Sequence, residues 1–296
     1  MENDFEISKL TTFKVGGKIK KLYLPASIEE FVEILKSEPN AKVLGNLSNV
    51  LISSNGYSGT VILTTKLDKV SVNGNQIEVM CGIKNPKLAQ FTAEKGLSGF
   101  EFMIGFPGTI GGNICMNASA HGQCISDNLI SAKCFYNGEI KELSKDDFKF
   151  SYRNSICQSE KIIVLSAKFE LKNADKDLIL QKMEENLNFR KTHQPSLSLP
   201  NCGSVFKNPQ NDSAGRLLDL VGAKQMTFGG AKVWENHANF IINHNNATSL
   251  DILKLMEKMS KEVENKFGIK LIPEVKFLGS NKEEEELCRK LQIELI

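Results

Sequence analysis

A glycine-rich segment at residues 105–112, Gly-Phe-Pro-Gly-Thr-Ile-Gly-Gly, constrains the fold of this chain most strongly. Four glycines and a proline in eight residues are not expected to form a regular helix or a central strand. Without Cβ atoms, such a loop can bring backbone N–H groups close to an anion, and a pyrophosphate is the natural ligand. It is neither a Rossmann fingerprint nor a P-loop, because it lacks Gly-x-Gly-x-x-Gly and Gly-Lys-Ser/Thr. A tight structural turn is an equally good interpretation of the local chemistry.

Two further turns are rich in small polar residues. Residues 45–49, Gly-Asn-Leu-Ser-Asn, lie between two predicted strands, and their side chains suit hydrogen bonds to phosphate or ribose. Alone this segment is best interpreted as a plain loop, but together with residues 105–112 it favours a dinucleotide lying between the two. In residues 201–206, Ser204 directly follows Gly203 and is not part of a Gly-x-Ser-x-Gly elbow. Without an adjacent base its hydroxyl is a poor nucleophile, but it can pass a proton. A turn serine is the simpler alternative.

Two charged residues are candidates for a site. Arg153, in Tyr152-Arg-Asn154, is either a surface charge or a two-pronged clamp for a carboxylate. Glu274, in Pro273-Glu-Val-Lys276, interrupts an otherwise apolar strand. Alternation places Val275 and Phe277 on one face and Glu274 on the other, so the pattern also permits solvent exposure.

The hydrophobic pattern mixes helices with hairpins, which favours an α+β fold over a doubly wound sheet. Helices are expected from Ser27, whose buried face is Ile28, Phe31, Val32 and Leu35, at residues 86–95, 175–190 and 213–221, and from 249 to a stop at Gly268. In the helix at 175–190, Leu178, Ile179, Met183 and Leu187 are expected on one side. Strands are expected at 21–25, 43–44, 50–52, 61–63, 162–165, 239–243 and through Glu274, with hairpins at Asn73-Gly74 and Asn137-Gly138. Pro195 and Pro200 indicate a domain boundary, and the Glu-rich tail, residues 281–296, is expected to form a solvated helix.

The composition excludes several functional classes. The net charge is only +2, so no nucleic acid or anionic membrane is expected as a partner. The 7 cysteines are odd in number and form no Cys-x-x-Cys pair, which argues against a disulfide framework and a thiolate metal site, so no metal is expected. No apolar run approaches the ~20 residues of a membrane span, and the N-terminus has no signal peptide pattern. A cytoplasmic location is therefore expected.

Nine segments, in this order, resemble the UDP-N-acetylenolpyruvoylglucosamine reductase family. The match runs from about Thr11 to Gly279. Any one segment is weak, but nine in register are very specific. They are residues 12–17, 44–52, 105–112, 116–118, 152–155, 203–209, 214–215, 237–241 and 273–275.

The resemblance implies an FAD-binding fold of the p-cresol methylhydroxylase/vanillyl-alcohol oxidase type with a C-terminal α+β substrate domain. The implied parts are FAD-binding subdomains at 1–66 and 67–190, a substrate domain at 191–280 and the tail at 281–296. The short connection between Ser155 and Pro200 resembles the family's second type, which lacks a tyrosine-bearing loop. A monomer is expected.

The resemblance also implies an activity and its residues. NADPH reduces non-covalently bound FAD, which then reduces UDP-GlcNAc-enolpyruvate to UDP-N-acetylmuramate in peptidoglycan precursor synthesis. The implied catalytic residues are Arg153, Ser204 as proton donor, and Glu274. The implied FAD contacts are Gly45, Asn46, Ser48, Asn49, Gly105, Pro107, Gly108, Thr109, Gly111, Gly112 and Asn117, and the implied substrate contacts are Asn208, His193 and Tyr152.

The chain departs from the family pattern in three places. Leu47 stands where glycine is usual and is expected to narrow the FAD pocket, while Ser119 and His121 replace glycine and tyrosine. His193 stands where lysine is common, and neutral histidine is a weaker partner for phosphate. Two rival hypotheses are a flavin oxidase of the same fold and a nucleotide-sugar-binding protein without activity. A serine hydrolase is a more distant alternative.

Overall fold

The chain divides into two compact units, each with its own apolar core, in a computed structural model that describes residues 1–296. Unit 1 comprises Met1–Leu22, Leu47–Thr60 and Lys191–Ile296, and unit 2 comprises Tyr23–Asn46 and Val61–Arg190. The predicted first subdomain, residues 1–66, contributes segments to both units. The four-part division by function therefore stays a prediction.

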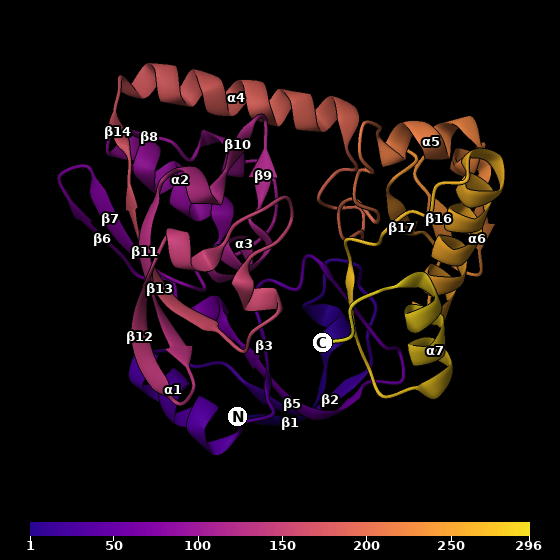
Figure 1. Ribbon diagram of the computed structural model, residues 1–296, viewed down its shortest axis with the longest axis horizontal. Coiled ribbons are helices and arrows are strands. Elements are labelled where there is room, and N and C mark those ends of the chain that lie inside the picture. The colour runs from indigo at the N-terminus through magenta and orange to yellow at the C-terminus, as the bar shows by residue number, and fades with distance from the viewer. The chain divides into compact units, whose positions relative to one another are not determined.

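An antiparallel sheet of five strands, in the order β12-β11-β13-β7-β6, forms the centre of unit 2 (Figure 1). Its strands are β6 (Val70–Asn73), β7 (Gln76–Met80), β11 (Leu129–Tyr136), β12 (Glu139–Ser144) and β13 (Ile163–Glu170). Both predicted hairpins are present. In the β11–β12 hairpin, Asn137 and Gly138 have φ values of 53° and 82°, as the two central residues of a type I′ turn require.

Four helices pack in unit 2: α1 (Ile28–Ser37), α2 (Asn85–Glu94), α3 (Ile110–Met116) and α4 (Lys176–His193), whose last residues belong to unit 1. α1 begins as predicted, because Ser27 Oγ accepts a hydrogen bond from Glu30 N at 3.2 Å. It buries Phe31, Val32 and Leu35, whereas Ile28 is only partly buried. The predicted face of α4 is wrong at Leu178, which is 64% exposed, because Asn186 joins Ile179 and Met183 on the buried side instead.

The expectation that residues 105–112 lie outside regular helix is wrong for the last three of them. Ile110, Gly111 and Gly112 form the first turn of α3. A Cβ on Gly111 would lie 3.1 Å from the Cβ of Cys81, and Gly111 N donates to Cys81 O at 2.8 Å. The glycine therefore allows the helix start to lie directly against the end of β7, a packing benefit that outweighs its poor helix propensity.

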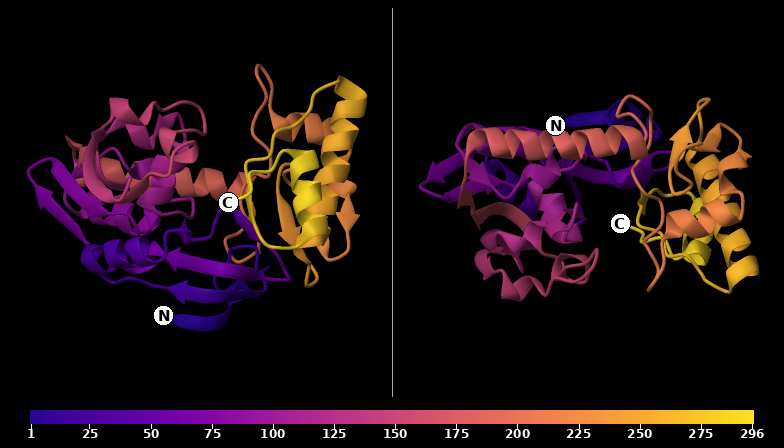
Figure 2. Two further views of the ribbon diagram at one scale, coloured as in Figure 1. Left: turned by 60° about the horizontal axis from the view of Figure 1, so that its bottom comes forward. Right: turned by 90° about the horizontal axis from the view of Figure 1, so that it is seen from above.

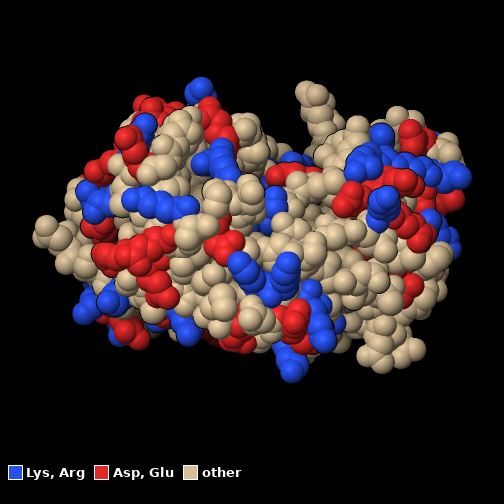
Figure 3. All heavy atoms as spheres, turned by 90° about the horizontal axis from the view of Figure 1, so that it is seen from below, with Lys and Arg blue, Asp and Glu red and all other residues tan.

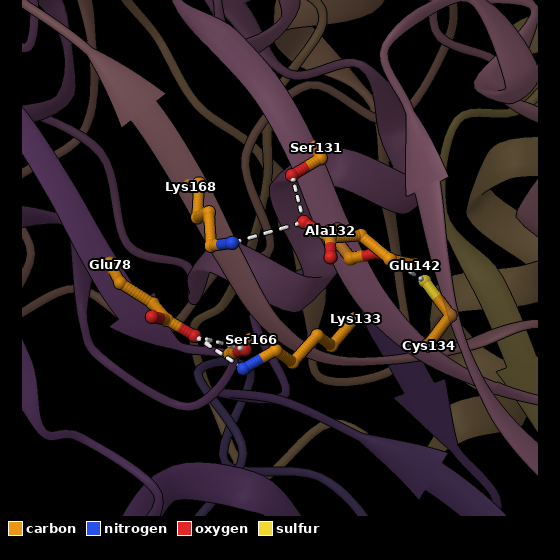
Figure 4. A network of polar contacts seen from close by, with 8 residues as sticks. All are labelled: Glu78, Ser131, Ala132, Lys133, Cys134, Glu142, Ser166 and Lys168. Atoms are coloured by element: carbon orange, nitrogen blue, oxygen red, sulfur yellow. Dashed lines mark hydrogen bonds and ion pairs between the residues drawn. The ribbon is translucent and has the colours of Figure 1, made fainter.

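One face of the five-stranded sheet carries a ladder of polar side chains (Figure 4). Glu78 on β7 accepts from Lys133 and from Ser166, both at 3.2 Å. Glu142 on β12 accepts from Ser131 at 2.7 Å and from Lys168 at 3.1 Å, and these bonds lower the pKa of its carboxyl group. Since the charged side chains are largely exposed, the ion pairs mark the solvated face and add little stability.

Unit 1 combines three helices with short strands (Figure 2). Its helices are α5 (Ala214–Leu220), α6 (Ser249–Phe267) and α7 (Lys282–Leu291). Its strands are β1 (Glu2–Glu6), β2 (Lys18–Tyr23, ending in unit 2), β4 (Val50–Ile52), β15 (Thr227–Phe228), β16 (Ala231–Val233), β17 (Ile241–Asn243) and β18 (Lys276–Leu278). The remaining strands are β3 (Lys42–Leu44), β5 (Tyr57–Leu63, which is shared between the units), β8 (Leu97–Ser98), β9 (Ser119–Ala120), β10 (Gln123–Cys124) and β14 (Lys172–Asn173).

The tail is helical as predicted, but the expectation that it is solvated is wrong. α7 buries Leu287, Cys288 and Leu291 in the core of unit 1. Its Glu284 is only 2% exposed. Beyond the helix, Phe277 N donates to Glu294 O at 2.9 Å, and Ile296 N donates to Phe277 O at 3.0 Å. The four glutamates at 283–286 suggest a solvated segment, but the apolar residues follow a helical period that outweighs them.

The expected strand through Glu274 is also displaced. β18 begins at Lys276 and pairs in parallel with β4, with Lys276 opposite Val50. Glu274 lies just before β18 and is held by separate backbone bonds. None of the helices combines the length and the apolar character that crossing a bilayer requires.

Candidate active site

Two buried asparagines, Asn85 and Asn113, pack against the glycine-rich loop of unit 2. Asn113 Nδ2 donates to Asn85 Oδ1 at 2.6 Å, and Asn85 N donates to Gly108 O at 3.2 Å. A Cβ on Gly108 would lie 2.7 Å from Asn85 Nδ2 and 3.0 Å from Asn113 Oδ1. Any side chain at position 108 would displace this pair of amides, so the packing of the loop requires glycine here.

The turn at Gly45 lies directly against the same loop. A Cβ on Gly45 would be 2.2 Å from Oγ1 of Thr109, which is the residue preceding α3. Within unit 2, the structure therefore places Gly45 of the first turn against Thr109 of the glycine-rich loop. Ser48 and Asn49 belong to unit 1, where the Nδ2 atom of Asn49 donates to Glu274 O at 3.1 Å.

Two buried oxygens at the ends of α3 have no hydrogen-bond partner in the protein: Thr109 Oγ1 before its first residue and Asn117 Oδ1 after its last. Thr109 occupies the N-cap position of α3, yet its hydroxyl caps no N–H group. Buried polar atoms in folded proteins are almost always paired, so these two oxygens are open to a bound group or an ordered water. Together with a loop that lacks Cβ atoms, they fit a cofactor with phosphate and hydroxyl groups.

Arg153 is held in an unusual backbone conformation in a tight turn. Its φ is 55°, in the left-handed region, and Ser151 and Asn154 exchange backbone hydrogen bonds at 3.1 and 3.2 Å around it. Its guanidinium donates to Ser119 Oγ at 2.7 Å. The Tyr152 ring centroid lies 5.5 Å from the Arg153 guanidinium carbon. Strained residues of this kind are frequent at functional sites, and Ser119, one of the departures from the family pattern, orients this one.

Ser204 and Glu274, in unit 1, lie on neighbouring backbone segments. Glu274 N donates to Val205 O at 2.8 Å, and Lys207 N donates to Ile272 O at 2.8 Å. On the other side, Ser204 forms an isolated antiparallel bridge with Phe240. Both Ser204 and Glu274 are partly buried. The structure thus brings together two of the predicted catalytic residues, while Arg153 is described within unit 2.

Two titratable residues of unit 1, Cys202 and His237, lie near Ser204 and Glu274 along these segments. Burial raises the pKa of the Cys202 thiol, and the nearby negative charge of Glu274 raises it further, so the thiol is protonated. Burial, and then the positive charge of Lys224, lowers the pKa of His237. His237 Nδ1 accepts a hydrogen bond from Asn239 N at 3.2 Å, which requires an unprotonated Nδ1.

The predicted substrate residues lie in exposed positions. Asn208 Oδ1 accepts from Ala214 N at 3.0 Å at the start of α5. His193 is the last residue of α4, and its Nδ1 lies 2.7 Å from Thr192 Oγ1. Tyr152 is 55% exposed.

The sequence did not predict the residues that support the candidate residues. Asn85 and Asn113 hold the glycine loop, Ser119 orients Arg153, and Asn239 pairs with the segment after Ser204. The only available signal was that each is a polar residue between apolar ones. Such a pattern does not distinguish a buried amide from a turn residue.

Two family models match this chain and define the class of protein to which it belongs. A family model described as an FAD binding domain matches residues 19–144, and one described as UDP-N-acetylenolpyruvoylglucosamine reductase, C-terminal domain, matches residues 194–278. The chain is an FAD-dependent oxidoreductase with the p-cresol methylhydroxylase/vanillyl-alcohol oxidase type of FAD-binding fold and a C-terminal α+β domain. The predicted α+β fold class and the predicted cofactor are confirmed.

Whole-chain relatives give the family. The chain is 44% identical to UDP-N-acetylenolpyruvoylglucosamine reductase from Caldicellulosiruptor bescii over 283 residues, which are 93% of this chain and 90% of the relative. It is 38% identical to the Bacillus subtilis reductase over 279 residues, 92% of each chain. The crystal structure of the Thermus caldophilus enzyme matches with a TM-score of 0.81 and 31% identity, covering 92% of this chain and 97% of that one. The chain belongs to the UDP-N-acetylenolpyruvoylglucosamine reductase family.

Proposed function

We propose that this chain catalyses the NADPH-dependent reduction of UDP-N-acetyl-3-O-(1-carboxyvinyl)-glucosamine to UDP-N-acetylmuramate. Family membership supports an enolpyruvyl reductase of peptidoglycan synthesis. The observation that supports the residue roles best is the bond of 2.8 Å from Glu274 N to Val205 O, which holds a hydroxyl and a carboxyl group on adjacent segments.

FAD, when bound, would supply the redox chemistry, which moves a hydride from NADPH to the terminal vinyl carbon of the substrate. The protein would stabilise the negative charge that forms on the substrate and supply the proton that completes the reduction. Hydride addition leaves negative charge on the adjacent carbon and the substrate carboxylate. In this proposal Arg153, already fixed by Ser119, stabilises that charge, because preorganised donors are typically a large catalytic contribution.

Ser204 completes the reaction by transferring its hydroxyl proton to the carbon that bears the ether oxygen, and its oxygen regains a proton from solvent. General acid assistance of this kind is worth roughly 10²–10⁴-fold. Glu274 acts beside it, as a protonated acid or by holding a donor in place. Asn208, His193 and Tyr152 are proposed to contact the substrate. The residues proposed to contact FAD are Gly45, Asn46, Ser48, Asn49, Gly105, Pro107, Gly108, Thr109, Gly111, Gly112 and Asn117.

The test is a visible absorption spectrum of the purified holoprotein, followed anaerobically. A flavin spectrum that bleaches with NADPH and returns on adding the enolpyruvyl sugar would support the cofactor, the donor and the acceptor together. Return of colour only with oxygen would favour a flavin oxidase. A protein that does not take up added FAD would favour the binding-protein alternative.

Ser204→Ala separates the two half-reactions. We expect flavin reduction by NADPH at the wild-type rate and a reoxidation by substrate that is slower by roughly 10²–10⁴-fold, since the general acid is missing. Stopped-flow absorbance measures both. A variant that binds FAD yet fails in the first half-reaction would show that the proton-donor role is wrongly assigned.

The cellular setting is part of the same proposal. The 7 cysteines are odd in number and form no Cys-x-x-Cys pair, which supports the proposed cytoplasmic location. The monomeric state and the second family type, without the tyrosine loop, remain predictions.

A further inference from the structure

The side-chain amide of Asn239 makes a pair of hydrogen bonds with the backbone of Phe206. Asn239 Nδ2 donates to Phe206 O at 2.8 Å, and Phe206 N donates to Asn239 Oδ1 at 3.0 Å. In addition, Val205 N donates to Asn239 O at 3.0 Å. Asn239 is 3% exposed and Phe206 is 1% exposed, so these bonds lie in a dry environment. The amide therefore takes the place that the backbone of a neighbouring strand would occupy.

This pairing fixes the segment that carries Ser204. The segment meets Phe240 through the Ser204 bridge on one side and Pro273 through the Phe206 bridge on the other. Neither bridge continues into a ladder, and the Asn239 amide adds two hydrogen bonds to the backbone bonds that Val205 makes with Asn239 and Glu274. Asn239 itself is fixed by its N–H bond to His237 Nδ1.

We infer that Asn239 is a positioning residue for Ser204: its amide pairs with Phe206 and thereby aims the Ser204 hydroxyl. The inference rests on the proposed role of Ser204 as proton donor. A displacement of a reacting group by about 1 Å can cost on the order of 10²-fold in rate, so the second half-reaction is sensitive to this pairing.

Asn239→Asp gives the sharpest test. One oxygen of an ionised aspartate still accepts from Phe206 N. Its other oxygen replaces the Nδ2 donor and faces Phe206 O, so two acceptors oppose each other. A protonated aspartate donates to Phe206 O and restores the pair. We therefore expect, at neutral pH, normal flavin reduction by NADPH and reoxidation by the enolpyruvyl sugar slowed by roughly ten- to a hundredfold, less than the loss of the general acid. The rate should recover as the pH is lowered.

The control is Asn243→Asp, the same change on β17. The Asn243 amide also bridges backbone groups, donating to Phe13 O at 3.1 Å and accepting from Ala247 N at 2.8 Å, but it does not contact the Ser204 segment. His237 and Glu274 also lie beside this region, and both are present in every variant. The comparison with wild type and Asn243→Asp therefore isolates the pH dependence that position 239 adds.

A double-mutant cycle decides whether Asn239 acts through Ser204. If it does, Asn239→Asp added to Ser204→Ala causes no further loss in reoxidation. Losses that multiply would overturn the inference, as would a single variant that reoxidises at the wild-type rate. If Ser204→Ala itself is without effect, the proposed proton donor is wrong and the inference falls with it. Asn239→Ser, whose smaller side chain admits water, repeats the cycle should the aspartate variant not retain FAD.

Discussion

Leu47 combines a strained backbone with a buried side chain. Its φ is 53°, and it is 3% exposed. The left-handed conformation costs a non-glycine residue roughly 1–2 kcal/mol, whereas truncating a buried leucine costs about 2–5 kcal/mol. The burial term is therefore the larger one. The family's usual glycine avoids the strain, and this chain gains apolar packing instead.

We accordingly expect Leu47→Gly to lower the free energy of unfolding by about 1–3 kcal/mol, because lost packing exceeds relieved strain. Urea unfolding followed by fluorescence measures this change. Lys14→Gly is the control, since Lys14 has a φ of 56° but is exposed, and its replacement should be neutral or slightly stabilising. A more stable Leu47→Gly protein would show that strain dominates.

His237 links stability to pH. Its pKa lies below the ordinary 6.5 because the ring is buried and faces Lys224. The unfolded chain then binds the proton more readily than the folded one, so stability falls as the pH drops below 6.5 towards the folded pKa. We expect His237→Gln to flatten this dependence between neutral and mildly acidic pH in urea unfolding. The same change at the exposed His244 is the control, and an unchanged slope in His237→Gln would refute the assignment.

At the scale of elements, the buried side chain of Glu284 connects α7 to other segments of unit 1 through hydrogen bonds. Glu284 accepts from Ser53 Oγ at 2.5 Å and from the hydroxyl of Ser249, the first residue of α6. Ser249 N donates in turn to Ser54 Oγ at 2.9 Å. The carboxylate thus lies at the start of a 19-residue helix, where the aligned peptide dipoles favour a negative charge.

Glu284→Ala should lower the free energy of unfolding by about 1–3 kcal/mol, because it leaves buried hydroxyl groups without their acceptor. Thermal and urea unfolding both report it. Glu283→Ala is the matched control, since that side chain is exposed on the same helix turn, and it should change stability by less than about 0.5 kcal/mol. Equal effects at the two positions would mean that the buried network contributes nothing.

At the scale of the whole molecule, the near-neutral charge and the cofactor determine how the chain behaves in solution. Lysines, arginines, aspartates and glutamates are interspersed on the face shown in Figure 3, and the formal net charge is +2. A long-range field of one sign is therefore not expected to steer ligands to the chain.

Removal of FAD should lower the melting temperature, because a ligand that binds only the folded state stabilises it by about 2.7 kcal/mol at a hundredfold excess over Kd. Differential scanning fluorimetry of apoprotein with increasing FAD tests this. In Gly45→Ala the new Cβ would lie 2.2 Å from Thr109 Oγ1, so we expect the shift to need more FAD. A shift identical to wild type would remove the Gly45 turn from the FAD site.

The sequence by itself determined most of the local structure of this protein and the family to which it belongs. The helix that begins after Ser27 and the Asn137-Gly138 hairpin are set by contacts within a few residues, which periodicity and turn chemistry record directly. Only the tertiary structure decided the rest. The burial of Glu284, the helical start at Gly111, and the pairing of Asn239 with Phe206 join segments far apart along the chain. A polar or glycine residue in one segment does not reveal which distant partner satisfies or packs against it, because that partner is fixed only when the chain folds.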